Sequence, residues 1–288
     1  MRAVPKHDTK VTLQLFAAIP LGDRAMEQAI VDTVALRFDE TGRGEPLVLL
    51  HGSNADRRQY TNFTPLLGDG IRAIATDQRD SPDSPCAPMP YGMEDHAHDL
   101  ARFLGEHGLD RAHIFGASYG GAVAMTFAIL YPHRVKSLIL AVTGSERSRF
   151  HAPDLSAIRN DNPDAVRRFM LEAVISPEAI DNDPDLVAEI NAVLLIREPD
   201  AFARRAAAIE AHNMTARLGE ITAPTLVLAG EHDPIAHATE AREMAAAIPG
   251  ARFEMLTGSR HGITLQHRER TAKIVRDFVL ANSREVSA

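Results

Sequence analysis

The stretch Gly116-Ala117-Ser118-Tyr119-Gly120-Gly121 decides the fold of this 288-residue chain. It follows a short apolar run at residues 112–115 and leads into a helical stretch at residues 120–130. In such a strand-turn-helix setting, the hydroxyl of a serine at the turn points out of the sheet. Glycines two residues before and two residues after the serine keep the crossing backbones from clashing. The pattern G-x-S-x-G therefore predicts a tight turn that presents Ser118 as a nucleophile.

Apolar runs of the same kind recur along the chain and alternate with helical stretches. We predict a hairpin from residues 30–31 and 34–38, buried strands at 47–50, 71–75, 112–115, 135–142 and 225–229, and helices at 94–107, 120–130 and 240–248. Strands that are buried on both faces are typical of a parallel sheet. The predicted class is therefore α/β, with a doubly wound, mostly parallel sheet whose ligands bind beyond the carboxyl ends of the strands.

A gap in this alternation separates the strand that ends near residue 142 from the next strand at residue 225. An ordinary helical crossover needs far fewer residues. Proline behind a capping residue is typical of a helix start, and the gap contains Pro163, Pro177, Pro184 and Pro199. We therefore predict an inserted helical cap. The predicted divisions are an N-terminal extension (1–26), the first part of the α/β core (27–146), the cap (147–216) and the second part of the core (217–288).

The composition of the chain limits its partners. It has 31 Lys and Arg against 39 Asp and Glu, a net charge of −8, which disfavours nucleic acid and anionic membranes as partners. No apolar run has the ~20 residues of a transmembrane helix. Cys86 is the single cysteine, so no internal disulfide forms and a cytoplasmic location is expected. We expect a small-molecule substrate and a monomer or homodimer.

These features resemble the α/β-hydrolase superfamily over most of residues 27–282. His51-Gly52 follows the apolar run at residues 47–50, as the HG loop does in that family. The resemblance implies an oxyanion hole formed by the backbone N–H groups of Ser53 and Tyr119. It also implies a catalytic triad in the chain order nucleophile, acid, histidine.

Three residues supply this triad in the required order: Ser118, Asp233 and His261. Asp233 stands in Gly230-Glu231-His232-Asp233-Pro234, and His261 stands in Gly258-Ser259-Arg260-His261-Gly262. By the resemblance, His261 takes the proton of Ser118 and returns it to the leaving group, while Asp233 holds the imidazole tautomer. Glu146, after the preceding strand, is the alternative acid.

One loop departs from the family pattern D-x-R-G-x-G-x-S. It reads Asp77-Gln78-Arg79-Asp80-Ser81-Pro82-Asp83-Ser84, with both glycines replaced. Asp tolerates a left-handed backbone, but Pro82 does not, so the second half of the loop has to turn differently. An Asp after the Arg also makes this chain resemble an anthracycline methylesterase-type branch. We interpret the aspartates of this stretch as side chains of a loop that is exposed to solvent.

No cofactor and no metal ion are expected. His96 and His98 stand between acidic residues, but positions i and i+2 project from different faces of a helix. We therefore interpret both as surface histidines. The chain has no H-E-x-x-H, no phosphate loop and no G-x-G-x-x-G.

We predict a serine hydrolase that cleaves a carboxylic ester or a lactone through an acyl-enzyme. The cap has eight Arg against twelve Asp or Glu, so it offers no excess positive charge. An apolar pocket is predicted from Phe169, Met170, Leu194 and Leu195. A carbon–carbon bond hydrolase of the meta-cleavage type is the alternative, followed by an amide hydrolase. A small-molecule receptor with a retained triad is an alternative from another class.

Overall fold

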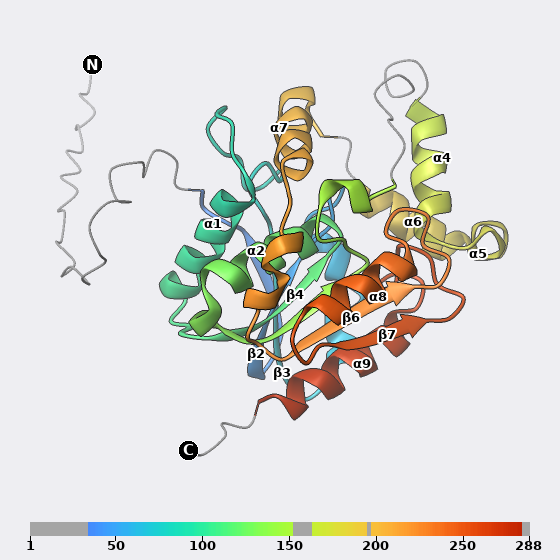
Figure 1. The fold of residues 1–288 in the computed structure, drawn as a ribbon. Helices are drawn as coiled ribbons and strands as arrows, with labels where there is room; N and C mark the ends of the chain where they lie inside the picture. The colour runs from blue at the N-terminus through green and yellow to red at the C-terminus, as the bar shows by residue number, and fades with distance from the viewer. Residues whose placement is uncertain (1–33, 152–162, 195–196, 284–288) are drawn as a thin grey trace, which may run out of the picture. The chain divides into compact units, whose positions relative to one another are not determined.

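The computed structural model describes residues 34–151, 163–194 and 197–283, without the side chains of residues 163–166. These residues contain a seven-stranded sheet of order β1-β3-β2-β4-β5-β6-β7 (Figure 1). The strands are β1 (Phe38–Gly42), β2 (Gly44–Leu50), β3 (Gly70–Thr76), β4 (Ala112–Ala117), β5 (Val135–Ala141), β6 (Thr225–Gly230) and β7 (Arg252–Leu256). Every neighbouring pair is parallel except β1 and β3. The predicted α/β class with a mostly parallel sheet is confirmed.

The predicted hairpin near the start of this sheet is wrong. Residues 30–31 lie outside the described residues, residues 34–37 form no strand, and β1 begins only at Phe38. β1 is an edge strand whose residues are mostly exposed and polar, and it pairs with β3. Because an edge strand needs few apolar side chains, the apolar pattern placed the strand too early in the chain.

Helices cover both faces of the sheet, as a doubly wound fold requires. The helices of the core are α1 (Met93–Glu106), α2 (Tyr119–Leu130), α8 (Ala238–Ala247) and α9 (Arg268–Ala281). Val48 and Leu50 of β2 pack in a core cluster with α1, α2 and α8. Leu47 and Leu49, on the opposite face, pack in a second cluster with α9. In Figure 1, α1 and α2 lie on the other side of the sheet from α9.

Four helices occupy the described part of the stretch between β5 and β6. They are α4 (Pro163–Val174), α5 (Pro177–Asn182), α6 (Pro184–Val193) and α7 (Pro199–Glu210). Each begins at one of the prolines that predicted a helix start. Ser176 and Asp183 accept hydrogen bonds from the first turns of α5 and α6. The helical character of the inserted segment agrees with the prediction, whereas the boundaries at residues 147 and 216 stay predictions.

Short 3-10 helices complete the described elements. They are η1 (Arg57–Tyr60), η2 (Thr64–Leu67), η3 (Pro132–Arg134), η4 (Arg147–Arg149) and η5 (Thr215–Glu220). η1 and η2 lie in the connection from β2 to β3, and this connection supplies Tyr60, Phe63 and Leu67 to the core cluster that contains α9.

The turn between β4 and α2 brings backbones into close contact. A methyl group added to Gly120 would lie 2.2 Å from the carbonyl oxygen of Leu50 in β2. One added to Gly116 would lie 2.2 Å from the carbonyl oxygen of Gly120, and one added to Gly121 would lie 2.5 Å from Cβ of Thr143. Glycine at these three positions is therefore a requirement of the packing.

We expect Gly120→Ala to destabilise the protein by about 3 kcal/mol, because the new methyl group clashes with a strand backbone. Gly105→Ala is the matched control, since Gly105 also lies in a helix but an added methyl group meets nothing within 4 Å. The free energy of unfolding of that variant should rise by about 0.5–1 kcal/mol, because Ala has a higher helix propensity than Gly. Urea unfolding of both variants gives the comparison, and equal stabilities would contradict the close approach.

Candidate active site

Ser118 lies in the turn between β4 and α2 with a backbone conformation that few residues adopt. Its φ is 54° and its ψ is −118°. The turn is held by four hydrogen bonds. The Ser118 N–H donates to the Ala141 carbonyl at 2.9 Å, and the Ser118 carbonyl accepts from the Gly121 N–H and the Thr143 hydroxyl, each at 2.8 Å, and from the Ala122 N–H at 3.2 Å. These bonds oppose the strain of a positive φ. The half-buried serine is thereby fixed at the carboxyl end of a central strand.

The loop after β2 lies beside this turn. A methyl group added to Gly52 would lie 3.8 Å from Cβ of Ser118, and the Gly52 N–H donates to Oε1 of Gln59 at 3.1 Å. The N–H groups of Ser53 and Tyr119 donate to no other residue in the described part of the chain. Both N–H groups therefore lack an acceptor within the described residues, as the predicted oxyanion hole requires.

Asp233 and His261 are brought together from two loops. Nδ1 of His261 donates to Oδ2 of Asp233 at 2.8 Å. The other carboxylate oxygen, Oδ1, accepts from the N–H groups of Ile235 at 2.8 Å and Ala236 at 3.0 Å. Asp233 is 4% exposed. Because both of its oxygens are engaged, the carboxylate is fixed and aimed at the imidazole.

The described residues show no hydrogen bond between the Ser118 hydroxyl and His261. Hydrogen bonds of a catalytic site often form only when substrate is bound. Glu146, the alternative acid, instead bonds Arg149 at 3.3 Å. The geometry therefore favours Asp233 over Glu146 as the partner of His261.

The end of α4 contacts the loop that carries His261. The backbone N–H groups of His261 and Gly262 donate to the carbonyls of Ala173 at 3.1 Å and Val174 at 2.8 Å. A methyl group added to Gly262 would lie 2.4 Å from Cγ1 of Val174. This helix therefore fixes the position of the histidine loop.

The residues predicted to line a pocket divide into two kinds. Phe169 and Met170 are partly exposed, and the sulfur of Met170 lies 3.9 Å from Nδ2 of Asn54, next to Ser53. Leu194 packs against an apolar cluster that α4 and α6 form together with Leu265, as structural residues do. Leu195 lies outside the described residues.

In the loop from Asp77 to Ser84, Asp77 and Asp80 are buried and only Pro82 and Asp83 are exposed. The interpretation of a solvated loop is therefore wrong for two of its three carboxylates. Asp80 is 7% exposed and has the left-handed backbone that the sequence allowed, with a φ of 62°. Its carboxylate accepts two hydrogen bonds from Arg204 at 2.7 and 2.9 Å and one from Tyr91 at 2.8 Å. Burial by itself raises the pKa of the Asp80 carboxyl group. The hydrogen bonds from Arg204 and Tyr91 have the larger combined effect, so the pKa lies below its ordinary value. The interpretation failed because the cation that pairs with Asp80 comes from α7.

Two further arginines of this region enter the core near the proposed oxyanion hole. Arg197 donates to the Ser53 carbonyl at 3.0 Å and also to the carbonyls of Ala55 and Asp80. Arg205, which is 1% exposed, donates to Gln78 at 3.1 Å and lies 4.0 Å from the ring centre of Tyr119. Sequence reasoning missed both arginines. The feature of the sequence that could have indicated them is the grouping of Arg197, Arg204 and Arg205 within a few residues of one another.

His96 is buried, which corrects its interpretation as a surface residue. It is 2% exposed, and its Nε2 lies 2.8 Å from the hydroxyl of Tyr119. Burial and the nearby guanidinium of Arg205 hold the pKa of His96 well below its ordinary value, so the ring is neutral at pH 7. His98 is exposed on the other side of α1, as predicted. His96 therefore supports the residue that follows the nucleophile.

A cavity of about 450 Å³ lies elsewhere, lined by residues that include Glu146, Arg147 and His212. It contains none of the predicted triad residues. Among the described residues, no helix combines the length and apolar character required to cross a bilayer.

Comparison with known proteins identifies the family of this chain. A model of the alpha/beta hydrolase family matches residues 47–274. The chain belongs to this family. It is a hydrolase, and the matched span contains Ser118, Asp233 and His261.

Individual relatives of this hydrolase differ in their substrates. It is 29% identical over 263 residues to a 2-hydroxy-6-oxononadienedioate/2-hydroxy-6-oxononatrienedioate hydrolase from Paraburkholderia xenovorans (strain LB400), covering 85% of this chain and 91% of that protein. A thermophilic esterase from Thermogutta terrifontis has a similar structure, with a TM-score of 0.78 and 28% identity over 87% of this chain and 95% of the esterase. Est816, an N-acyl homoserine lactone degrading enzyme, gives a TM-score of 0.75 and 26% identity over 85% and 97% of the two chains.

We expect Arg204→Gln to lower the free energy of unfolding by about 2–3 kcal/mol at pH 7, because the substitution leaves the Asp80 carboxylate buried with fewer hydrogen-bond partners. The matched control is Arg168→Gln, whose side chain is 81% exposed and bonds Glu172; it should stay within about 0.5 kcal/mol of wild type. Because the pKa of Asp80 is lowered in the fold, this stabilisation is complete above its ordinary value of 3.8 and is lost as the pH falls below it. Denaturant unfolding at several pH values measures both effects. A cost for Arg204→Gln that is independent of pH would contradict the pairing.

Proposed function

We propose that this hydrolase cleaves a carboxylic ester or a lactone of a small, largely apolar substrate through an acyl-enzyme on Ser118. The observation that carries the proposal is the 2.8 Å hydrogen bond between His261 and Asp233, combined with a serine on a strained turn at a strand end. In this arrangement the imidazole is oriented as a general base, and the serine hydroxyl is the group it deprotonates.

The reaction follows from these roles. His261 takes the proton of Ser118 as the hydroxyl attacks the substrate carbonyl, and then gives it to the leaving alcohol. The negative charge of the tetrahedral intermediate lies on an oxygen that accepts from the N–H groups of Ser53 and Tyr119. Water then attacks the acyl-enzyme with His261 again as base, which releases the acid and restores Ser118.

Two similarities support ester or lactone cleavage. The Thermogutta protein is described as an esterase and Est816 as an enzyme that degrades an N-acyl homoserine lactone. Met170 beside Asn54 offers an apolar side chain near the proposed oxyanion hole, which suits an apolar acyl or alcohol group.

A carbon–carbon bond hydrolase is the second candidate. It is favoured by the Paraburkholderia relative, whose named substrate is a dicarboxylate with a ketone and no ester. A panel of esters, lactones, amides and a 2-hydroxy-6-oxo-dienoate distinguishes these reactions. Turnover above about one per second on any of them distinguishes an enzyme from a receptor that retains the triad.

Ser118→Ala should fold normally and lose turnover by ~10³-fold or more on every substrate of the panel that wild type cleaves. A fluorophosphonate should add mass to the peptide that contains Ser118. Ser148→Ala is the control, because Ser148 is an exposed serine in η4. If the Ser118 variant keeps wild-type rates, or the label appears on another peptide, Ser118 is not the nucleophile.

Asp233→Asn should lower kcat by ~10³- to 10⁴-fold while KM changes little. The two backbone N–H groups at Oδ1 require an acceptor there, so the amide NH₂ of Asn faces Nδ1 of His261. The imidazole then carries its proton on Nε2 and cannot act as a base. Steady-state kinetics of Glu146→Gln provides the control, with almost no expected change. The reverse pattern in the two variants would make Glu146 the acid.

A further inference from the structure

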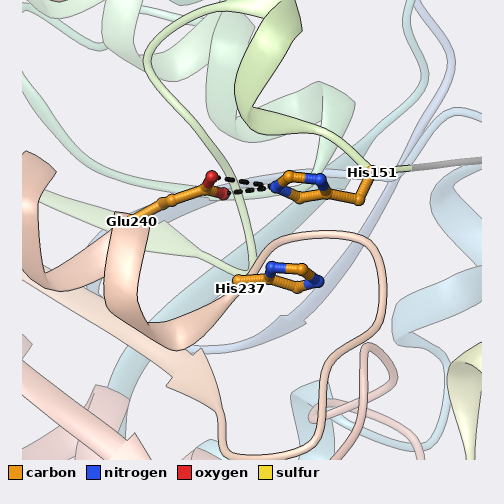
Figure 2. Close-up of side chains that lie close together, drawn as sticks. All are labelled: His151, His237 and Glu240. Carbon is orange, nitrogen blue, oxygen red and sulfur yellow. Dashed lines mark hydrogen bonds and ion pairs between the residues drawn. The ribbon is translucent and has the colours of Figure 1, made fainter.

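Three side chains that could each bind a metal ion, two imidazoles and one carboxylate, meet outside the proposed active site. His151 follows η4, His237 precedes α8, and Glu240 lies in the first turn of α8. Their ligand atoms all lie within 4.8 Å of one another. Figure 2 shows the two imidazole rings face to face, with the carboxylate of Glu240 directed at His151. The ring centres are 4.0 Å apart and the planes differ by 6°.

Within this cluster, the two ring nitrogens of His237 make no hydrogen bond to the described residues. Nε2 of His151 donates to the two carboxylate oxygens of Glu240 at 2.8 and 2.9 Å. The ring of His237 makes no hydrogen bond within the described residues, and it does not cap α8. Both rings are exposed, so a lone pair of His237 is accessible from solvent.

We propose that His151, His237 and Glu240 bind one divalent transition-metal ion, for which Zn²⁺ is the best match. Two imidazoles and one carboxylate are a ligand set that Zn²⁺ accepts, with water in the fourth position. Hard cations such as Mg²⁺ and Ca²⁺ favour oxygen ligands and suit this cluster less well. On binding, the ion replaces the proton on Nε2 of His151, and that proton leaves to solvent.

The side chains need only a small adjustment to hold the ion. Ligands at 2.0–2.1 Å around a tetrahedral Zn²⁺ lie about 3.3 Å apart, compared with at most 4.8 Å here. A metal ion lies in the plane of each imidazole that binds it, so one of the two stacked rings has to tilt. Because both rings are exposed, no core packing opposes that rotation.

The ion would join two segments that already touch through their backbones. The His151 N–H donates to the Ile235 carbonyl at 2.7 Å, and the Ile235 N–H donates to Asp233 at 2.8 Å. The site therefore spans the segment that leaves η4 and the loop between Asp233 and α8. Metal binding stabilises this junction without supplying a group to the reaction.

The test is titration of the full chain with Zn²⁺ by calorimetry, after metal removal with a chelator and without an affinity tag. We expect one ion per chain and a rise in Tm of about 5 °C when free Zn²⁺ is about a hundredfold above Kd. Co²⁺ as a probe should give the visible absorption of a four-coordinate site. His151→Ala, His237→Ala and Glu240→Gln should each weaken Zn²⁺ binding about tenfold or more.

The matched controls are His133→Ala, an exposed histidine outside the cluster, and Glu243→Gln, one turn along α8 from Glu240. Both should bind Zn²⁺ as wild type does. The proposal is overturned if wild type shows no saturable Zn²⁺ binding, or if the three cluster variants bind as tightly as the controls. None of these measurements uses hydrolysis, so the result is independent of the proposed ester or lactone reaction.

Discussion

The contact between the Ser118 turn and the strands beside it is the constraint on which the rest of the site depends. Gly120 lies so close to the end of β2 that a methyl group has no room at 2.2 Å from the Leu50 carbonyl. β4 lies between β2 and β5, so the same approach places Ser118 beside Gly52 and next to Ala141 and Thr143. A positive φ at serine costs about 1–3 kcal/mol, and the surrounding hydrogen bonds oppose that cost. The register of three strands thus fixes both the serine and the loop that carries the proposed oxyanion hole.

The inserted segment is joined to the core by buried and partly buried guanidinium groups as well as by apolar contacts. Arg204 pairs with Asp80, Arg205 lies over Tyr119, and Arg197 donates to the Ser53 carbonyl. Each buried cation has to keep its partners, because burial of an unpaired charge is strongly unfavourable. The orientation of this segment is therefore specified by hydrogen bonds to Ser53 and Asp80 and by the contact of a guanidinium with the Tyr119 ring. Net charge counted along the segment gave no sign of this, because it does not reveal which charges face the core.

Patterns that act over short distances in sequence were the ones that predicted structure. Buried strands, the turn at Ser118 and the helix starts at proline all depend on neighbouring residues, and these features were predicted correctly. Three errors have a common cause: the hairpin before Phe38, the solvated loop around Asp80 and the surface position of His96. Each depends on a partner distant in sequence, such as β3, Arg204 or Tyr119. The sequence order of Ser118, Asp233 and His261 identified the candidate triad only through resemblance to a family, since spacing alone does not bring them together.

The geometry separates the proposed catalytic pair from the inserted segment that is proposed to select the substrate. Asp233 is held by N–H groups of its own loop and by His261, so its orientation requires no side chain from the inserted helices. His261 contacts that segment through its backbone, at the carbonyl of Ala173. A backbone contact persists when side chains change. Side chains such as Phe169 and Met170 are therefore free to vary with the substrate while the Asp233–His261 pair stays in place, which is consistent with relatives that share this fold and differ in the bonds they cleave.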